Sequence, residues 1–337
     1  MRKIYRIGDR ITSLRKELAT TVKKTSYLSS VMKETQTFDL AVAVSWEFDE
    51  EFLSVIESTA HRCGMSLYPI RRNNIEETMT ALRNQLLQFR CLLDRASDED
   101  ESFLSLARFL AHQHCCRVIN PHDLVTRAAD KATMHLELIA HGIETPYTII
   151  ISPYNHKREV ELSLSELARL GRPFIIKPAN TTGGGIGVVT GAESLKDVLD
   201  ARQHHKNDKY LLQETIRPAY LSEDRGWFRV FYAFGEIIPC WWDDVTHAYE
   251  IVSREQEATF GLGQLSEITA RIHQVCRLDF FSMEIAFTTK GRFVVVDYVN
   301  ELCDMRLQSK HPDGVPDEVV QRIVNQMLSF VQSLPLP

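Results

Sequence analysis

A lysine between an apolar run and a glycine-rich loop is the feature of the sequence that most suggests chemistry. Residues 174–176 are apolar and predict a short buried strand, and Lys177 follows them directly. Glycine lets backbone N–H groups come close to a ligand because no Cβ intervenes, and a cluster of such groups beside an ammonium suits phosphate oxygens. The segment therefore predicts a phosphate-binding loop, with a plain hairpin tip as the alternative. Its glycines are Gly183, Gly184, Gly185 and Gly187.

Two common glycine motifs do not match this loop. A Walker loop ends in Lys-Ser or Lys-Thr and opens a helix, whereas Lys177 precedes the glycines. A dinucleotide-binding fingerprint also opens a helix, whereas Gly187 is followed by Val188-Val189-Thr190, which favours a strand. We therefore expect the loop to join two strands and to act as a flap.

Two carboxylates near the end of the chain form the second candidate site. If Lys290-Gly291 is a two-residue turn, Glu284 lies opposite Asp297 in a hairpin. Opposed carboxylates repel each other, and a divalent cation would relieve the repulsion. Mg²⁺ is typically held by one or two carboxylates together with substrate phosphates. Asn300 adds an oxygen only if the strand bends there. The alternatives to a metal site are two independent surface carboxylates, or a different turn length that separates them.

Alternating strands and helices in the first third of the chain predict a small parallel sheet. Strands are expected at 38–44, 66–70, 89–93 and 117–120. Helices are expected at 49–61, from an N-cap at Asn74, and at 103–114.

The remainder of the chain is expected to carry both candidate sites. Asp130 should cap a helix that ends at Gly142, which places Lys131 in its first turn. Further strands are expected at 147–152, 173–177, 210–214, 228–234, 237–242, 280–287 and 292–299. Further helices are expected at 163–170, 194–204 and 316–334.

Composition indicates a soluble globular protein, because 44% of the 337 residues are hydrophobic and 25% are charged. This length suits two or three packed subdomains. No apolar run is long enough to span a bilayer and no hydrophobic signal peptide opens the chain, so we expect no membrane partner. Seven cysteines without a regular framework favour a reducing compartment, and the expected location is cytoplasmic.

Residues 1–37 are basic, with nine Lys/Arg against three Asp/Glu, although the whole chain has a formal net charge of −6. Ile11, Leu14 and Leu18 have helical spacing, which predicts a helical extension that packs on the body. A transit-like or nucleic-acid-binding arm is the alternative. We expect no nucleic-acid partner.

The order and spacing of these motifs resemble the ATP-grasp family over about residues 38–330, most nearly the ribosomal-protein glutamate ligase and glutathione synthetase group. The resemblance implies an α/β (α+β) ATP-grasp fold with a small N-terminal parallel-sheet domain. It also implies the following division of the chain: a basic helical extension (1–37), a pre-ATP-grasp domain (38–120), a small subdomain with the glycine flap (121–212), and a large subdomain with the metal site (213–337).

The resemblance also implies roles for individual residues. Lys131 and Lys177 would contact ATP phosphates, and Lys177 and Arg229 would be catalytic. The flap would consist of Gly183, Gly184, Gly185 and Gly187. The adenine–ribose hinge would consist of Gln213, Glu214 and Ile216. Mg²⁺, or Mn²⁺ as an alternative, would be held by Glu284, Asp297 and Asn300.

The sequence departs from the family pattern at three places. Gly226-Trp227 stands where the family usually has an aspartate shortly before the arginine that matches Arg229. One extra residue separates Asp297 from Asn300, so Glu301 is an alternative oxygen donor. A family arginine is missing where residues 241–244 read Trp-Trp-Asp-Asp, which leaves the substrate open.

The activity that the resemblance implies is ATP-dependent ligation of a carboxylate to an amine through an acyl phosphate. The substrates would be small molecules or peptides, and a homo-oligomer is an open alternative to a monomer. A small-molecule kinase and a non-catalytic ATP-binding protein are the alternative functions.

Two further pairs of residues allow a functional interpretation. Trp241 and Trp242 point to opposite faces of a regular strand, so only one of them can line a substrate pocket. Asp304 and Arg306 either bind a charged substrate or form a surface salt bridge.

Overall fold

A computed structural model describes residues 35–98, 100–113, 116–180 and 185–336. The predicted extension at 1–37 lies almost wholly outside the described residues, as do Gly183 and Gly184. In the described part of the chain, no helix is long and apolar enough to cross a membrane. Five of the described cysteines are free thiols: Cys63, Cys91, Cys240, Cys276 and Cys303.

The first sheet is parallel, as the sequence predicts, and its strand order is β2-β1-β3-β4. Its strands are β1 (Gln36–Val44), β2 (Leu67–Ile70), β3 (Leu87–Arg95) and β4 (Arg117–Ile119). The helices between them are α2 (Asp49–Arg62), α3 (Ile75–Arg83) and α4 (Glu101–Ala111). Alternate residues of β1 enter two different cores, because helices cover both faces: Leu40 packs with α2, and Ala41 with α3 and α4.

Two details of this domain differ from the sequence prediction. Helix α4 ends at Ala111 instead of His114. Asn74 precedes α3 but does not cap it, because its side chain accepts from Arg71 N at 2.8 Å and donates to Pro69 O at 3.0 Å. Asn74 therefore closes the turn before the helix.

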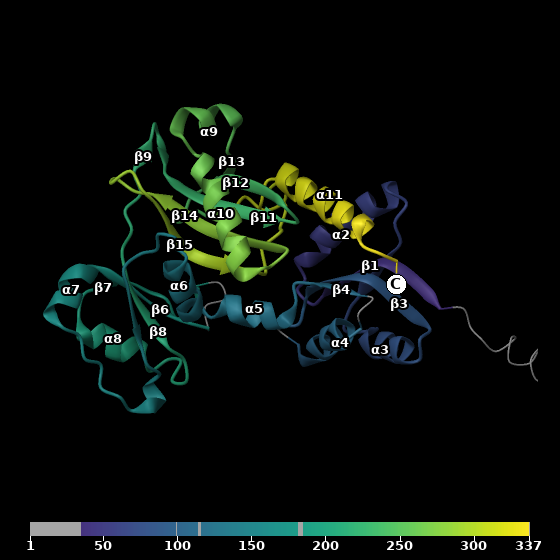
Figure 1. The fold of residues 1–337 in the computed structure, drawn as a ribbon, viewed down its shortest axis with the longest axis horizontal. Helices are drawn as coiled ribbons and strands as arrows, with labels where there is room; N and C mark the ends of the chain where they lie inside the picture. Colours follow the sequence, from purple (N-terminus) through teal and green to yellow (C-terminus); the bar gives the residue numbers. More distant parts are fainter. Residues whose placement is uncertain (1–34, 99, 114–115, 181–184, 337) are drawn as a thin grey trace, which may run out of the picture.

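The second sheet is antiparallel, with the order β5-β8-β6-β7. Its strands are β5 (Thr148–Ile151), β6 (Phe174–Pro178), β7 (Val189–Ala192) and β8 (Tyr210–Glu214). Helices α7 (Leu164–Leu170) and α8 (Leu195–Ala201) pack on one face of it (Figure 1). The glycine loop joins β6 to β7, so the prediction that it links two strands is confirmed.

The third sheet is antiparallel, with the order β13-β12-β11-β14-β15. Its strands are β11 (Trp227–Ala233), β12 (Glu236–Trp242), β13 (Tyr249–Ile251), β14 (Phe280–Phe287) and β15 (Phe293–Asn300). Helix α10 (Gly263–Cys276) covers one face, and α11 (Asp317–Ser333) covers the other and contacts α2 (Figure 1). A short ribbon of β9 (Tyr220–Leu221) and β10 (Asp224–Arg225) precedes the sheet.

Several helices were not predicted from the sequence. They are α5 (His122–Ala129), α9 (Arg254–Phe260) and α10, and the last two lie between the strands expected at 237–242 and 280–287. Leu265, Thr269 and Ile272 of α10 are buried at helical spacing, and Ser253 forms a capping box with Gln256 before α9. Both signals were present in the sequence.

A buried arginine of the first domain holds the loop after β15. Arg95 Nη2 lies 2.6 Å from Asp49 Oδ1, and both side chains are at most 4% exposed. The same Arg95 nitrogen donates to Cys303 O at 3.0 Å. The segment after β15, the strand that carries Asp297 and Asn300, is therefore held by the parallel-sheet domain.

Candidate active site

The turn between β14 and β15 has three residues. The backbone N–H of Thr288 donates to the carbonyl of Arg292 at 2.9 Å, which closes a loop of residues 289–291. Gly291 adopts the left-handed conformation with φ 70°, as the last residue of such a loop commonly does. The two-residue turn predicted at Lys290-Gly291 is therefore wrong.

Glu284 nevertheless lies directly opposite Asp297. Ile285 pairs with Val295, which differs by one residue from the register of a two-residue turn. An irregularity in β15 then takes up one extra residue, so the next pair is Glu284 with Asp297. The predicted pairing of the two carboxylates is confirmed.

A second irregularity in β15 orients Asn300. Ser282 pairs with Asn300, so the strand again takes up one extra residue. In a regular strand, Asp297 and Asn300 would point to opposite faces of the sheet. Here their partners on β14, Glu284 and Ser282, lie on one face, so Asp297 and Asn300 lie on that face too. With its amide oxygen toward Arg229, Asn300 accepts from Arg229 Nη1 at 3.2 Å. The bend that the sequence analysis required for Asn300 is present.

Two lysines of the neighbouring elements converge on Asp297. Lys131 Nζ lies 3.6 Å and Lys177 Nζ 4.0 Å from Asp297 Oδ1. Lys177 Nζ also donates to Val296 O at 3.2 Å, which joins β6 of the second sheet to β15 of the third. The two lysines predicted from separate motifs thus lie at one carboxylate.

The start of helix α6 (Lys131–Ala140) is held in three ways. Asp130 caps the helix as predicted, by accepting hydrogen bonds from its first backbone N–H groups. Lys209 Nζ lies 2.6 Å from Asp130 Oδ2, and Lys131 N donates to Ala179 O at 3.0 Å. Lys131 is therefore fixed beside the loop that follows β6.

Both oxygens of Glu284 contact residues of β11. Arg229 Nη2 forms an ion pair with Oε1, and Trp227 Nε1 donates to Oε2 at 3.2 Å. The guanidinium of Arg229 also lies over the ring of Trp242, 4.6 Å from its centroid. Trp227, one of the two residues that stand where an aspartate was expected, therefore contacts Glu284 directly.

Burial and charge shift the pKa values of this cluster in different directions. Burial lowers the pKa of Lys177, and Asp297 opposes that shift. Burial raises the pKa of Glu284 above its usual value, although Arg229 opposes it. Burial acts on Asp297 too, but Lys131 and Lys177 outweigh it and the pKa of Asp297 is lowered. The site thus contains two lysine side chains at one carboxylate and a guanidinium at the other.

The predicted hinge residues use their side chains inside the protein. Gln213 Nε2 donates to the hydroxyl of Tyr298 at 2.6 Å, and Glu214 Oε1 accepts from Tyr147 N at 2.8 Å. Ile216 is half-buried in the segment that follows β8. Any role of these residues at an adenine ring would therefore fall mainly to their backbone.

Tyr298 and His135 were not singled out from the sequence. Tyr298 OH lies 2.7 Å from His135 Nδ1, and the ring centroid of Tyr298 lies 5.3 Å from Lys177 Nζ. Burial and the charge of Lys177 lower the pKa of His135 to about 4. The only signal for Tyr298 was its position directly after Asp297, and no signal marked His135.

Of the predicted flap glycines, the structure describes Gly185 and Gly187. Both have left-handed backbones, at φ 77° and 76°. A Cβ on Gly187 would lie 3.0 Å from His205 Nε2 and 3.3 Å from Pro178 Cγ, whereas a Cβ on Gly185 would meet nothing within 4 Å. Gly187 is therefore required for conformation and for space.

The other pairs considered from the sequence have clear positions. Trp241 packs in the core against Phe228, whereas Trp242 lies beside Arg229. Only Trp242 is thus at the site. Arg306 is paired with Asp304 at 2.7 Å and with Asp313 at 2.9 Å, so the salt-bridge interpretation is confirmed.

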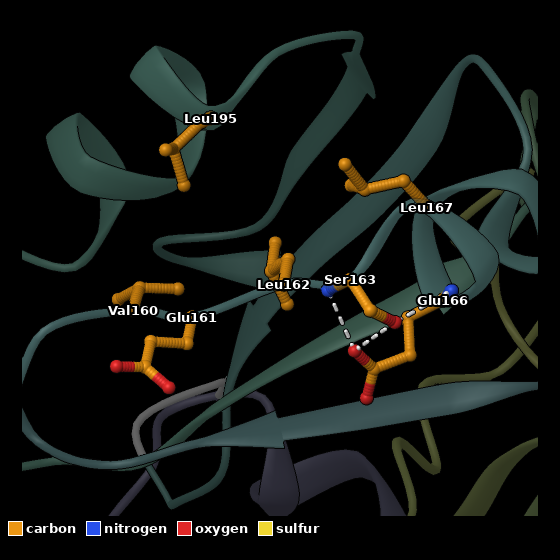
Figure 2. Close-up of a pocket in the computed structure, with 7 residues that line it drawn as sticks. All are labelled: Val160, Glu161, Leu162, Ser163, Glu166, Leu167 and Leu195. Carbon is orange, nitrogen blue, oxygen red and sulfur yellow. Dashed lines mark hydrogen bonds between the residues drawn. The ribbon is translucent and has the colours of Figure 1, made fainter.

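An apolar cavity of about 600 Å³ lies beside the second sheet and includes none of the predicted site residues. Figure 2 shows its lining, which includes Leu162, Leu167 of α7 and Leu195 of α8. Of its two acidic residues, Glu161 and Glu166, the second is engaged in the capping box of Ser163. The chemistry-bearing residues gather between the second and third sheets instead.

Comparison with solved structures identifies the architecture. A D-alanine–D-alanine ligase from Bacillus anthracis, complexed with ATP, matches with a TM-score of 0.61 at 13% identity, over 87% of this chain and 96% of that chain. The chain has the ATP-grasp fold. The ATP-grasp ligase PsnB, complexed with a minimal precursor, Mg and ADP, also has a TM-score of 0.61 at 13% identity, over 87% of this chain and 98% of that chain.

A third ATP-grasp structure has a higher identity and a lower TM-score. It is a RimK domain protein from Sphaerobacter thermophilus DSM 20745, with a TM-score of 0.54 at 18% identity, over 86% of this chain and 99% of that chain. No model of a known protein family and no curated protein matches the sequence. The ATP-grasp fold expected from the motif order is therefore confirmed, including the N-terminal parallel sheet.

Proposed function

We propose that this ATP-grasp protein is a ligase that joins a carboxylate to an amine through an acyl phosphate, with consumption of ATP. The observation that carries the proposal is the meeting of Lys131 and Lys177 at Asp297, which faces Glu284. These residues come from α6, β6, β14 and β15. Solved structures of the same fold include ligases with ATP or with ADP and Mg, which supports the proposal.

In this proposal, the triphosphate of ATP lies between the second and third sheets. Lys131 and Lys177 would contact its phosphates, and the adenine–ribose part would lie at Gln213, Glu214 and Ile216. Preorganised positive charge at a transferring phosphoryl group is commonly the largest catalytic contribution of a protein. The glycine loop would cover the phosphates and exclude water, which would otherwise hydrolyse an acyl phosphate.

The residues around the carboxylate pair fit Mg²⁺. In the part of the chain that the structure describes, no cluster of three His, Cys, Asp or Glu side chains gathers as a metal site. The donors are instead Glu284, Asp297 and the amide oxygen of Asn300, an all-oxygen set of the type that leaves positions for phosphate. When bound, Mg²⁺ would neutralise phosphate charge. The domain division and the cytoplasmic location predicted from the sequence belong to the same proposal.

The proposed reaction has two covalent steps. A substrate carboxylate oxygen bonds to the γ-phosphorus, and the bond from that phosphorus to the β–γ bridging oxygen breaks, so ADP leaves. The amine nitrogen of the second substrate then bonds to the acyl carbon, and phosphate and a proton leave. Arg229 lies beside Glu284 and Asn300, so it would stabilise negative charge on the transferred group.

The test is a screen of amino acids, amines and carboxylates for phosphate release from ATP, followed by mass spectrometry of the product. A ligase gives free phosphate and an amide, whereas a kinase leaves the phosphate on the substrate. Lys177→Ala should lower kcat/KM by about two orders of magnitude, or about 3 kcal/mol of transition-state stabilisation. Near-normal turnover in that variant would contradict the assignment of the site.

A further inference from the structure

We propose that the hydroxyl of Tyr298 is a positioning group that sets the spacing between the nucleotide hinge and the phosphate-binding lysine. The inference rests on the proposed function, because it assigns a role within the same ATP site. Tyr298 would not touch the nucleotide. It would act through Gln213 on one side and through Lys177 and Asp297 on the other.

The hydroxyl joins three separate elements. It accepts a hydrogen bond from Gln213 Nε2 of β8 at 2.6 Å, and it lies 2.7 Å from His135 Nδ1 of α6. Tyr298 itself belongs to β15. The three side chains are at most 3% exposed, so water does not compete for these hydrogen bonds.

One arrangement satisfies all three groups, given that Gln213 Nε2 faces the hydroxyl. A glutamine amide nitrogen is only a donor, so the tyrosine oxygen must accept from Gln213. The hydroxyl then has its single hydrogen available for His135 Nδ1, which accepts it in the neutral tautomer protonated at Nε2. In this arrangement Gln213 and His135 are both satisfied, and removal of the oxygen takes away a hydrogen-bond partner from each of these two buried groups.

The position of Tyr298 makes this network relevant to the nucleotide. Residue 298 follows Asp297 directly, and Lys177 Nζ lies 5.3 Å from the ring centroid of Tyr298. Lys177 belongs to the second sheet and is bonded to Val296 O of the third sheet at 3.2 Å. The hydroxyl network and this lysine contact are thus two neighbouring ties between the sheets that form the walls of the proposed ATP site.

Tyr298→Phe tests the inference because it keeps the ring beneath Lys177 and removes only the oxygen. The matched control is Thr269→Val, which removes another fully buried hydroxyl from the same core; Thr269 bonds to Leu265 O on α10 and lies on none of the elements that carry the proposed site. Binding of AMP-PNP with Mg²⁺ is measured by calorimetry, and thermal unfolding is measured for each variant without nucleotide.

We expect Tyr298→Phe to weaken AMP-PNP binding by about tenfold, the effect of one to two buried hydrogen bonds. Thr269→Val should bind within about twofold of the wild type. Equal binding by Tyr298→Phe and the wild type would overturn the inference and leave the proposed function intact. A wild-type protein that does not bind AMP-PNP would overturn the proposed function, and the inference with it.

A second pair of variants keeps the test decisive if Tyr298→Phe does not fold. His135→Asn keeps an acceptor near the position of Nδ1, whereas His135→Leu removes it. The inference requires His135→Leu to lose affinity for AMP-PNP and His135→Asn to recover most of it. Equal affinities in the two variants would overturn it, because packing alone would then account for the role of His135.

Discussion

Glu284 on β14 lies directly opposite Asp297 on β15, although the turn between the strands has three residues instead of the expected two. The pair is stable in the protein because each carboxylate has its own cations. Arg229 contacts Glu284, and Lys131 and Lys177 lie within 4.0 Å of Asp297. Opposed carboxylates of this kind are unfavourable unless positive charge compensates them.

Glu284→Gln is expected to weaken the effect of Mg²⁺ on nucleotide binding. The substitution removes one of the two carboxylates proposed to hold the metal and keeps the size of the side chain. The Mg²⁺ concentration that half-saturates the tightening of AMP-PNP binding should rise at least about tenfold. Calorimetric titrations of AMP-PNP at several Mg²⁺ concentrations measure the change.

Glu301→Gln is the control for this variant, because Glu301 is the alternative oxygen donor beyond Asn300. Burial raises the pKa of Glu301 above its usual value, so its neutral form is favoured relative to that of an exposed glutamate. We expect the Mg²⁺ dependence to be nearly unchanged in Glu301→Gln. A larger effect in Glu301→Gln than in Glu284→Gln would indicate that the metal binds at the end of β15 instead.

The pairing of Glu284 with Asp297 could be predicted from the sequence only in part. The alternation of apolar residues identified both strands, and the short connection identified a hairpin. The turn length was wrong by one residue, and the irregularity in β15 after Val295 compensates for it. Bulges depend on contacts from neighbouring strands, so one strand's own sequence does not reveal them.

Long-range partners were the least predictable part of the site. Lys131 and Lys177 were found from local motifs, but nothing local indicated that both would meet one carboxylate. Likewise, the contact of Tyr298 with His135 joins residues separated by 163 positions. Helix α10 was missed for a different reason. Its apolar residues at helical spacing were present in the sequence but were not recognised as a helix.

His135 is expected to make the folded protein less stable in mild acid. Burial and the charge of Lys177 lower the pKa of His135 from 6.5 to about 4. Between these values the unfolded chain binds a proton that the folded protein does not, so stability falls as the pH drops from 6.5 towards 4. The loss due to this group should be about 2 kcal/mol, after allowance for solvent screening.

Urea unfolding at pH 7.5, 5.5 and 4.5 measures this loss. His135→Asn removes the titrating group, so its free energy of unfolding should change less with pH than that of the wild type. The difference between the two proteins isolates His135, because the carboxylates that titrate in the same range are common to both. Identical pH dependences would show that His135 becomes protonated in the folded protein as readily as in the unfolded chain.

Gly187→Ala is expected to destabilise the glycine loop more than Gly185→Ala. Both glycines have left-handed backbones, so both substitutions should cost about 1 kcal/mol for the backbone alone. At Gly187 the new Cβ would also lie 3.0 Å from His205 Nε2 and 3.3 Å from Pro178 Cγ, which should add about 1 kcal/mol of overpacking. Urea unfolding of the two variants measures both contributions. In a His205→Ala background the closest of these contacts is absent, so the cost of Gly187→Ala should fall close to that of Gly185→Ala. Equal losses for the two glycines in the wild-type background would show that the loop moves away from His205 without a penalty.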